Sequence, residues 1–157
     1  MTGLLGEYEC RLDRKNRFAL PAGLKKQLPE QAQNQFVINR GFERCLVLYP
    51  HNEWEKITTE IQKLNDYDRD NRRFMRYFFR GATVLTLDGS DRLLIPQQLQ
   101  KHAGIDRDLV LFAYTNKIEL WDHATYEQLM EEEPEDFAAL AERIMGSLNT
   151  SENRNSQ

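Results

Sequence analysis

The chain has 157 residues, of which 40% are hydrophobic and 29% are charged, with a formal net charge of −4. This composition is typical of a globular protein, and no run approaches the roughly 18 apolar residues of a membrane span, which excludes a membrane-embedded class. The negative net charge also argues against the uniformly basic surface that is typical of DNA-binding domains.

The first half of the chain is predicted to consist of short strands and helices. The segment GEYECRLD alternates in character, as a strand with one buried face does. Pro21 stands where a helix can begin, since its missing N–H costs nothing at the first helical position. The expected elements are strands near 6–12 and 17–20, a helix near 22–28, strands near 35–39 and 45–49, and helices near 52–65 and 68–79.

The second half is predicted to repeat this order and to end in a polar tail. Residues 147–157 lack apolar periodicity, so we expect them to be disordered. The other expected elements are strands near 82–87 and 92–95, a helix near 97–103, strands near 108–113 and 118–121, and a helical region over 124–146 that is interrupted at Pro134.

The two halves share a sequence repeat. LDRKNRFALP at residues 12–21 returns as LDGSDRLLIP at residues 87–96, shifted by 75 positions. Further on, the aromatic, histidine and acidic residues of 49–55 return at 121–127, shifted by 72. A repeat of this length indicates two copies of one supersecondary unit.

The repeated core has the form D-x-x-x-R-φ-φ-φ-P, where φ is apolar. Its aspartate and arginine flank a polar turn, which a carboxylate–guanidinium contact can close. We therefore interpret Asp13 with Arg17, and Asp88 with Arg92, as structural pairs of the two turns.

These motifs resemble the MraZ family. The resemblance depends on the doubled motif, on Arg80-Gly81-Ala82 before its second copy and on the later strand Ile118–Trp121, and it covers roughly residues 1–145. The residue before the motif arginine is often glycine in that family, whereas here it is Asn16 and Asp91. Asparagine and aspartate tolerate left-handed backbone best among the other residues, so we expect the turn to be retained.

The resemblance implies an α+β fold of two tandem AbrB-like (SpoVT-AbrB) β-rich, swapped-hairpin modules with short helices and a pseudo-twofold internal repeat. It also implies a bacterial transcription regulator that forms homo-oligomeric rings larger than a dimer. The expected divisions of the chain are a first module at 5–51, connecting helices at 52–80, a second module at 81–124, a C-terminal helical segment at 125–146 and the tail at 147–157.

The turn of the first copy is the candidate DNA-binding site. Arg11, Arg14, Lys15 and Arg17 stand there with Asp13 as the one acid, and clustered cations on a tight turn can enter a groove or bridge phosphates. The alternative is a solvated turn with Arg17 paired to Asp13. The second turn, Gly89-Ser90-Asp91, has no such cations, so we expect the first repeat to contact DNA and the second to assemble.

The distribution of charge reconciles this site with the acidic chain. Residues 127–142 hold seven acids and no lysine or arginine, which leaves the rest of the chain at +3 of the net −4. Screening limits the reach of a charge to about 10 Å. The local field at the turn, and not the net charge of the chain, therefore determines whether DNA is attracted to the turn.

A second cluster of arginines lies at helical spacing in residues 69–80. A surface helix, with arginines solvated or paired to acids of a neighbouring subunit, is the favoured interpretation, and direct DNA contact is the alternative.

No catalytic, metal or cofactor site is predicted. His51 and His123 occupy equivalent positions at helix starts, and Cys10 and Cys45 lie in expected strands, where reduced core cysteines are common. No P-loop or Gly-rich dinucleotide motif is present. The N-terminus MTGLLGEY lacks a signal-peptide pattern, so we expect a cytoplasmic, nucleoid-associated protein without a membrane partner.

The predicted function is therefore a sequence-specific transcription regulator, not an enzyme, which binds double-stranded DNA at promoter repeats as a ring. The resemblance implies control of the division and cell-wall gene cluster. The alternative is an oligomeric structural or protein-interaction scaffold without DNA binding, which the acidic balance favours.

Overall fold

The computed structural model describes residues 3–132 and 136–155. It divides into two compact units, residues 1–124 and residues 125–157, and each unit is described by itself. None of the helices in these described ranges combines the length and the apolar character that crossing a bilayer requires.

The described elements follow the predicted order with two additions, a single 3₁₀ turn and a longer last helix. In chain order they are β1 (Leu4–Arg11), β2 (Arg17–Ala19), α1 (Ala22–Lys25), η1 (Glu30–Ala32), β3 (Gln35–Arg40), β4 (Leu46–Pro50), α2 (His51–Ile61), α3 (Arg69–Phe79), β5 (Thr83–Thr86), β6 (Arg92–Leu94), α4 (Gln97–Ala103), β7 (Asp108–Thr115), β8 (Lys117–Asp122), α5 (His123–Glu131) and α6 (Phe137–Asn155).

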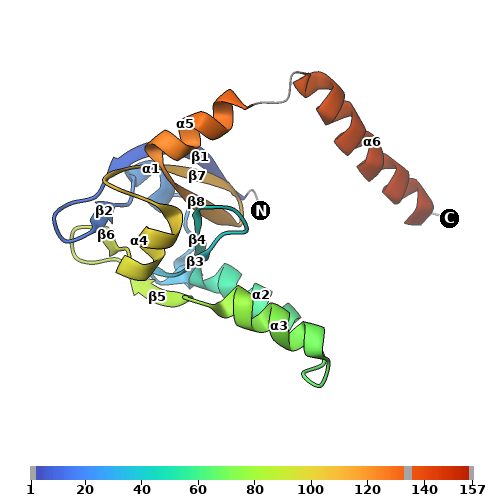
Figure 1. Cartoon of the computed structure of the whole chain (residues 1–157), viewed down its shortest axis with the longest axis horizontal. Helices are drawn as coiled ribbons and strands as arrows, with labels where there is room; N and C mark the ends of the chain where they lie inside the picture. Colours follow the sequence, from blue (N-terminus) through green and yellow to red (C-terminus); the bar gives the residue numbers. More distant parts are fainter. Residues whose placement is uncertain (1–2, 133–135, 156–157) are drawn as a thin grey trace. The chain divides into compact units, whose positions relative to one another are not determined.

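The strands of the two repeats share one sheet. Its order is β1-β7-β8-β4-β3-β5, with every neighbouring pair antiparallel, and β2 pairs with β6 in a separate two-stranded ladder (Figure 1). The order reads the same from either end if each strand is exchanged for its repeat counterpart. The α+β fold with a pseudo-twofold repeat is therefore present, with the twofold axis between β4 and β8.

The two repeats exchange strands with each other in space. The modules predicted at residues 5–51 and 81–124 are continuous along the sequence, but their strands are paired across the two repeats. β1 of the first repeat pairs along its whole length with β7 of the second, and β5 of the second repeat pairs with β3 of the first. Neither repeat can complete its sheet alone, because its outer strand is hydrogen-bonded to the other copy. The two copies consequently form one compact unit.

The hydrophobic core has the same twofold character. Its largest buried side chains come in equivalent pairs, one from each repeat, and full burial of such a side chain stabilises the fold by about 1.5–3 kcal/mol. The pairs, all at most 1% exposed, include Phe18 with Leu93, Leu24 with Leu99, Phe36 with Leu109, Leu46 with Ile118 and Leu48 with Leu120.

Three sequence-based expectations are corrected at helices. The helix expected over 22–28 ends at Lys25, and the helix expected to reach residue 65 ends at Ile61. The tail over 147–157 was predicted to be disordered, but α6 continues to Asn155. Extending a helix that has already begun is far easier than nucleating one, so a polar tail can remain helical behind the alanine-rich start of α6. Residues 156–157, and Pro134 with its predicted interruption, lie outside the described residues.

Candidate nucleic-acid interface

A single carboxylate closes the turn between β1 and β2. Asp13 Oδ1 accepts hydrogen bonds from the backbone N–H groups of Lys15 and Arg17 at 2.8 and 3.0 Å. Asp13 Oδ2 accepts a third from Arg17 Nε at 2.9 Å. Asn16 adopts the left-handed backbone that the sequence predicted, with φ at 60°. The turn is therefore held by hydrogen bonds to one carboxylate. The side chains of Arg14 and Lys15 take no part in these bonds.

The second turn has the same construction. Asp88 Oδ1 accepts from the backbone N–H groups of Ser90 and Arg92 at 2.8 and 2.9 Å, and Asp88 Oδ2 accepts from Arg92 Nε at 2.9 Å. Asp91 takes the left-handed position, with φ at 58°. The doubled sequence motif is thus a doubled turn geometry.

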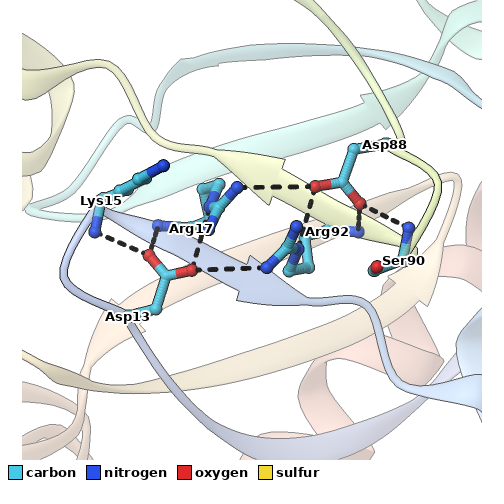
Figure 2. A network of polar contacts seen from close by, with 6 residues as sticks. All are labelled: Asp13, Lys15, Arg17, Asp88, Ser90 and Arg92. Carbon is cyan, nitrogen blue, oxygen red and sulfur yellow. Dashed lines mark hydrogen bonds and ion pairs between the residues drawn. The ribbon is translucent and has the colours of Figure 1, made fainter.

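The two turns are also joined to each other (Figure 2). Arg17 Nη1 lies 3.9 Å from Asp88 Oδ2, and Arg92 Nη1 lies 4.0 Å from Asp13 Oδ2, so each arginine contacts both carboxylates. β2 and β6, which carry the two arginines, pair antiparallel. The result is a four-residue charge network, defined here as Asp13, Arg17, Asp88 and Arg92, that fixes the position of one turn relative to the other.

Both carboxylates of this network favour their charged form. Hydrogen bonds from the backbone N–H of Arg17, above all, lower the pKa of Asp13 from its ordinary 3.8, and the backbone N–H of Arg92 has the same effect on the pKa of Asp88. The guanidinium contacts act in the same direction, while desolvation opposes them. Asp13 and Asp88 therefore remain ionised at neutral pH.

The tip of the first turn carries two exposed cations. Arg14 and Lys15 are exposed, and neither forms an ion pair with any residue that the structure describes. Arg14 also lines a hollow of about 310 Å³ together with Arg107, which comes from the loop before β7 of the second repeat. Asp106 lines the same hollow, so the surface there is mixed in charge.

Two other predicted site residues are engaged. Arg11 Nε lies 3.0 Å from Asp108 Oδ1 across the β1–β7 ladder, in a pair that is more than half exposed. Arg17 belongs to the charge network. Of the four cations expected to contact DNA, Arg14 and Lys15 are therefore those with no acid partner in the described ranges. Arg107 was missed, because nothing in the sequence signals that a residue more than 90 positions away joins the turn.

The tip of the second turn carries the opposite character. Gly89 has open space around it, Ser90 is neutral, and Asp91 pairs with Lys25 Nζ at 2.7 Å. The tip residues of this turn include no cation of their own. The repeats thus share a frame and differ in what the frame presents.

Two of the three histidines contact glutamates, and neither cysteine forms a disulfide. His51 Nδ1 lies 3.3 Å from Glu55, and His123 Nε2 lies 3.2 Å from Glu9. Both cysteines are free, and burial raises the pKa of Cys10 to about 11 and that of Cys45 to about 12, which keeps the thiols protonated and unreactive.

Comparison with known proteins gives matches along almost the whole chain. The model of one family, described as "MraZ protein, putative antitoxin-like", matches residues 4–77 and again residues 78–148. These two matches coincide with the two structural repeats.

Three relatives carry the name "Transcriptional regulator MraZ". That of Christiangramia forsetii is 43% identical over 148 residues, which is 94% of this chain and 96% of the relative. That of Flavobacterium psychrophilum is 41% identical over 97% of this chain and 98% of the relative. That of Cytophaga hutchinsonii is 39% identical over 89% of this chain and 93% of the relative.

Proposed function

This chain belongs to the MraZ family of transcriptional regulators, and we propose that it acts by binding double-stranded DNA through the tip of its first turn. The observation that carries the proposal is the pair of exposed cations, Arg14 and Lys15, on a turn whose motif residues Asp13 and Arg17 are engaged with each other. A turn whose backbone is already held in place does not have to be ordered at the moment of binding, which favours affinity.

The contacts follow from the chemistry of the two side chains. A lysine ammonium binds phosphate oxygens as a point charge, whereas an arginine guanidinium also binds the O6 and N7 atoms of guanine in the major groove. Phosphate contacts fix position, and base contacts read sequence. We assign Lys15 mainly to phosphate and Arg14 to phosphate or base, with Arg107 extending the basic surface and Arg17 holding the turn.

One turn makes too few contacts for tight binding, so the proposal includes self-assembly. We propose a homo-oligomeric ring larger than a dimer that places several turns on repeated promoter sites. Linking such weak sites raises the overall affinity by about 10²–10⁴. The exposed aromatics of α3, Phe74 and Tyr77, support association, since a monomer leaves them uncovered.

The target that we propose is the promoter of the division and cell-wall gene cluster, which the family resemblance implies. The test is a titration of that promoter DNA with purified protein at several salt concentrations. We expect a shift to a discrete complex that weakens as salt rises, and stronger binding to promoter repeats than to unrelated DNA of equal length. Equal binding to both DNAs would contradict sequence specificity.

The second candidate is an oligomeric scaffold without DNA binding. It is favoured by the net charge of −4 and by the acidic tip residue of the second turn. A ring by light scattering that shows no DNA binding at about 50 mM salt, where phosphate contacts are strongest, would select this candidate.

A further inference from the structure

Helix α3 presents an unusually basic surface next to aromatic side chains. Its aromatic side packs on Trp54 of α2, with ring centroids 5.8 Å apart for Phe78 and 5.7 Å for Phe79. Phe74 stacks on Phe78 at 5.5 Å and stays 42% exposed, while Tyr77 is 69% exposed. The helix is therefore anchored to the first unit, and part of its apolar surface is left uncovered.

Five arginines accompany these aromatics. Arg72 Nη1 donates to the backbone carbonyl of Asp66 at 2.9 Å, and none of the five forms an ion pair with the residues of 3–132 or 136–155. Like charges three or four residues apart on a helix destabilise it. An external partner that supplies acids would remove this repulsion. The five are Arg69, Arg72, Arg73, Arg76 and Arg80.

Two hollows lie along this surface and share Tyr77 and Arg80. The smaller, of about 370 Å³, is lined by these two residues together with Arg73 and Arg76. The larger, of about 410 Å³, reaches from Arg80 past Phe78 to Arg40 and His102. We call the two hollows together the arginine groove.

Two residues that line the larger hollow of the arginine groove have buried polar atoms. Arg40 Nε and His102 Nε2 are both buried, and neither has a hydrogen-bond partner in the described part of the chain. Two acids, Glu43 and Glu119, and the cation Lys117 also line this hollow, and Glu119 accepts from Trp121 Nε1 at 3.0 Å. Burial is the main cause that lowers the pKa of His102, and the charge of Arg40 lowers it further. The contribution of Arg40 shows a positive local field, which suits a carboxylate. Buried polar groups normally have a hydrogen-bond partner, which a carboxylate in the hollow or an ordered water can provide.

We propose that the arginine groove binds the acidic segment of a second copy of this chain, residues 127–142. The inference rests on the proposed ring, whose contact surfaces it identifies. The segment offers seven acids and no lysine or arginine. Around the acids, exposed apolar side chains can cover Phe74 and Tyr77 of α3; they are Met130, Phe137, Ile144, Met145 and Leu148.

The architecture favours a second copy as the source. A head-to-tail ring requires two different surfaces on each subunit that fit one another. The helices that follow β4 carry the basic surface, and those that follow β8, their repeat counterparts, carry the acidic one. One chain therefore holds both halves of a heterologous contact.

Two charge-reversal variants test this contact. The groove variant is Arg73→Glu with Arg76→Glu, and the segment variant is Glu131→Arg with Glu132→Arg. We expect light scattering to give about 18.5 kDa for each variant alone, against a larger mass for the parent. Circular dichroism checks that each variant is folded.

Mixing the two variants is the decisive step. The groove of the segment variant and the segment of the groove variant are both intact, and the two reversed surfaces are also opposite in charge, so a one-to-one mixture should associate to at least a dimer of about 37 kDa, twice the 18.5 kDa of one chain. If the mixture stays monomeric, the groove does not bind the segment of a second copy and the proposal is overturned. A Lys26→Glu, Lys101→Glu control makes the same change in charge outside the groove and should retain the parent mass.

The remaining outcomes separate this inference from the function. A parent ring whose mass survives both reversals overturns the contact and leaves the ring and DNA binding intact. The same result with weaker DNA binding by the groove variant would instead assign the arginines to DNA. A parent that is itself a monomer overturns both the ring and this inference.

Discussion

The two turns of this protein share one backbone and differ at their tips. In each, an aspartate accepts two backbone hydrogen bonds and one from an arginine four residues later, and a non-glycine residue takes the left-handed position. The first tip presents Arg14 and Lys15, and the second presents Gly89 and Ser90. The sequence motif therefore describes a structural frame, while the residues between the motif positions carry the difference in chemistry.

This difference explains how a repeat can divide its roles. The four-residue charge network needs both copies, since each arginine contacts both aspartates. The tips take no part in it through their side chains, so they can change without loss of the fold. Substitutions can therefore break either the tip or the frame.

The largest expected effect comes from removing the basic tip. Arg14→Ala with Lys15→Ala should weaken promoter binding by about tenfold or more, because an arginine–base contact alone is worth about 1–3 kcal/mol. Thermal stability should be unchanged, since both side chains are exposed. Fluorescence anisotropy with labelled promoter DNA gives the affinity.

The matched control for the tip variant is Lys56→Ala with Lys63→Ala. It makes the same change in net charge at exposed lysines that pair locally with Glu53 and Glu60. It should bind DNA as the parent does. Equal losses in the two variants would mean that net charge, and not the tip, sets the affinity.

Breaking the frame should act first on stability. Asp88→Ala removes three hydrogen bonds of its own turn and the acid that Arg17 also contacts, so we expect a melting temperature several degrees lower or a smaller oligomer. DNA binding should fall only as the first turn loses its support. Calorimetry and light scattering measure the two effects, and a parent-like result in both would remove the structural role of Asp88.

Acid should weaken the frame in a defined direction. Because the pKa values of Asp13 and Asp88 are lowered in the folded state, their contribution to stability is complete above the ordinary 3.8 and is lost as pH falls through the lowered values. The parent should therefore lose more stability as pH falls from about 5 to about 3 than an Asp13→Asn, Asp88→Asn variant. Urea unfolding across this pH range measures the free energy of unfolding of both proteins. Equal losses in the parent and the variant would contradict the role given to the two aspartates.

The smallest effect is expected at Arg11. Its pair with Asp108 is mostly exposed, and such pairs contribute about 0–1 kcal/mol. Arg11→Ala should leave the melting temperature almost unchanged and weaken DNA binding less than the tip variant does. An effect on affinity as large as that of the tip variant would place Arg11 within the contact surface.

Much of this frame was predictable from the sequence, because it depends on local contacts. The Asp13–Arg17 and Asp88–Arg92 pairs span four residues, and the left-handed Asn16 and Asp91 follow from residue type. The repeat likewise predicted the order of elements, since equivalent segments adopt equivalent structures.

The contacts between residues of the two repeats could not be predicted from local sequence patterns. The approach of Arg17 to Asp88, the Arg11–Asp108 pair and the position of Arg107 beside Arg14 all arise from the swapped pairing of β1 with β7 and of β2 with β6. Pairing across 70 or more residues is set by how the whole core packs, and no local propensity reports it. The buried polar atoms of the arginine groove were hidden for the same reason.

The most direct test of DNA binding by the first turn is to replace its tip with that of the second turn. A variant with Arg14→Gly, Lys15→Ser and Asn16→Asp gives the first turn the tip of the second within an intact frame. The slope of the logarithm of the DNA-binding constant against the logarithm of salt concentration should become shallower by about 0.9 for each phosphate that the variant no longer binds, which is about 1.8 per bound turn if both cations bind phosphate. The melting temperature should stay close to that of the parent. An unchanged slope and affinity in a folded variant would show that DNA is bound elsewhere on the protein.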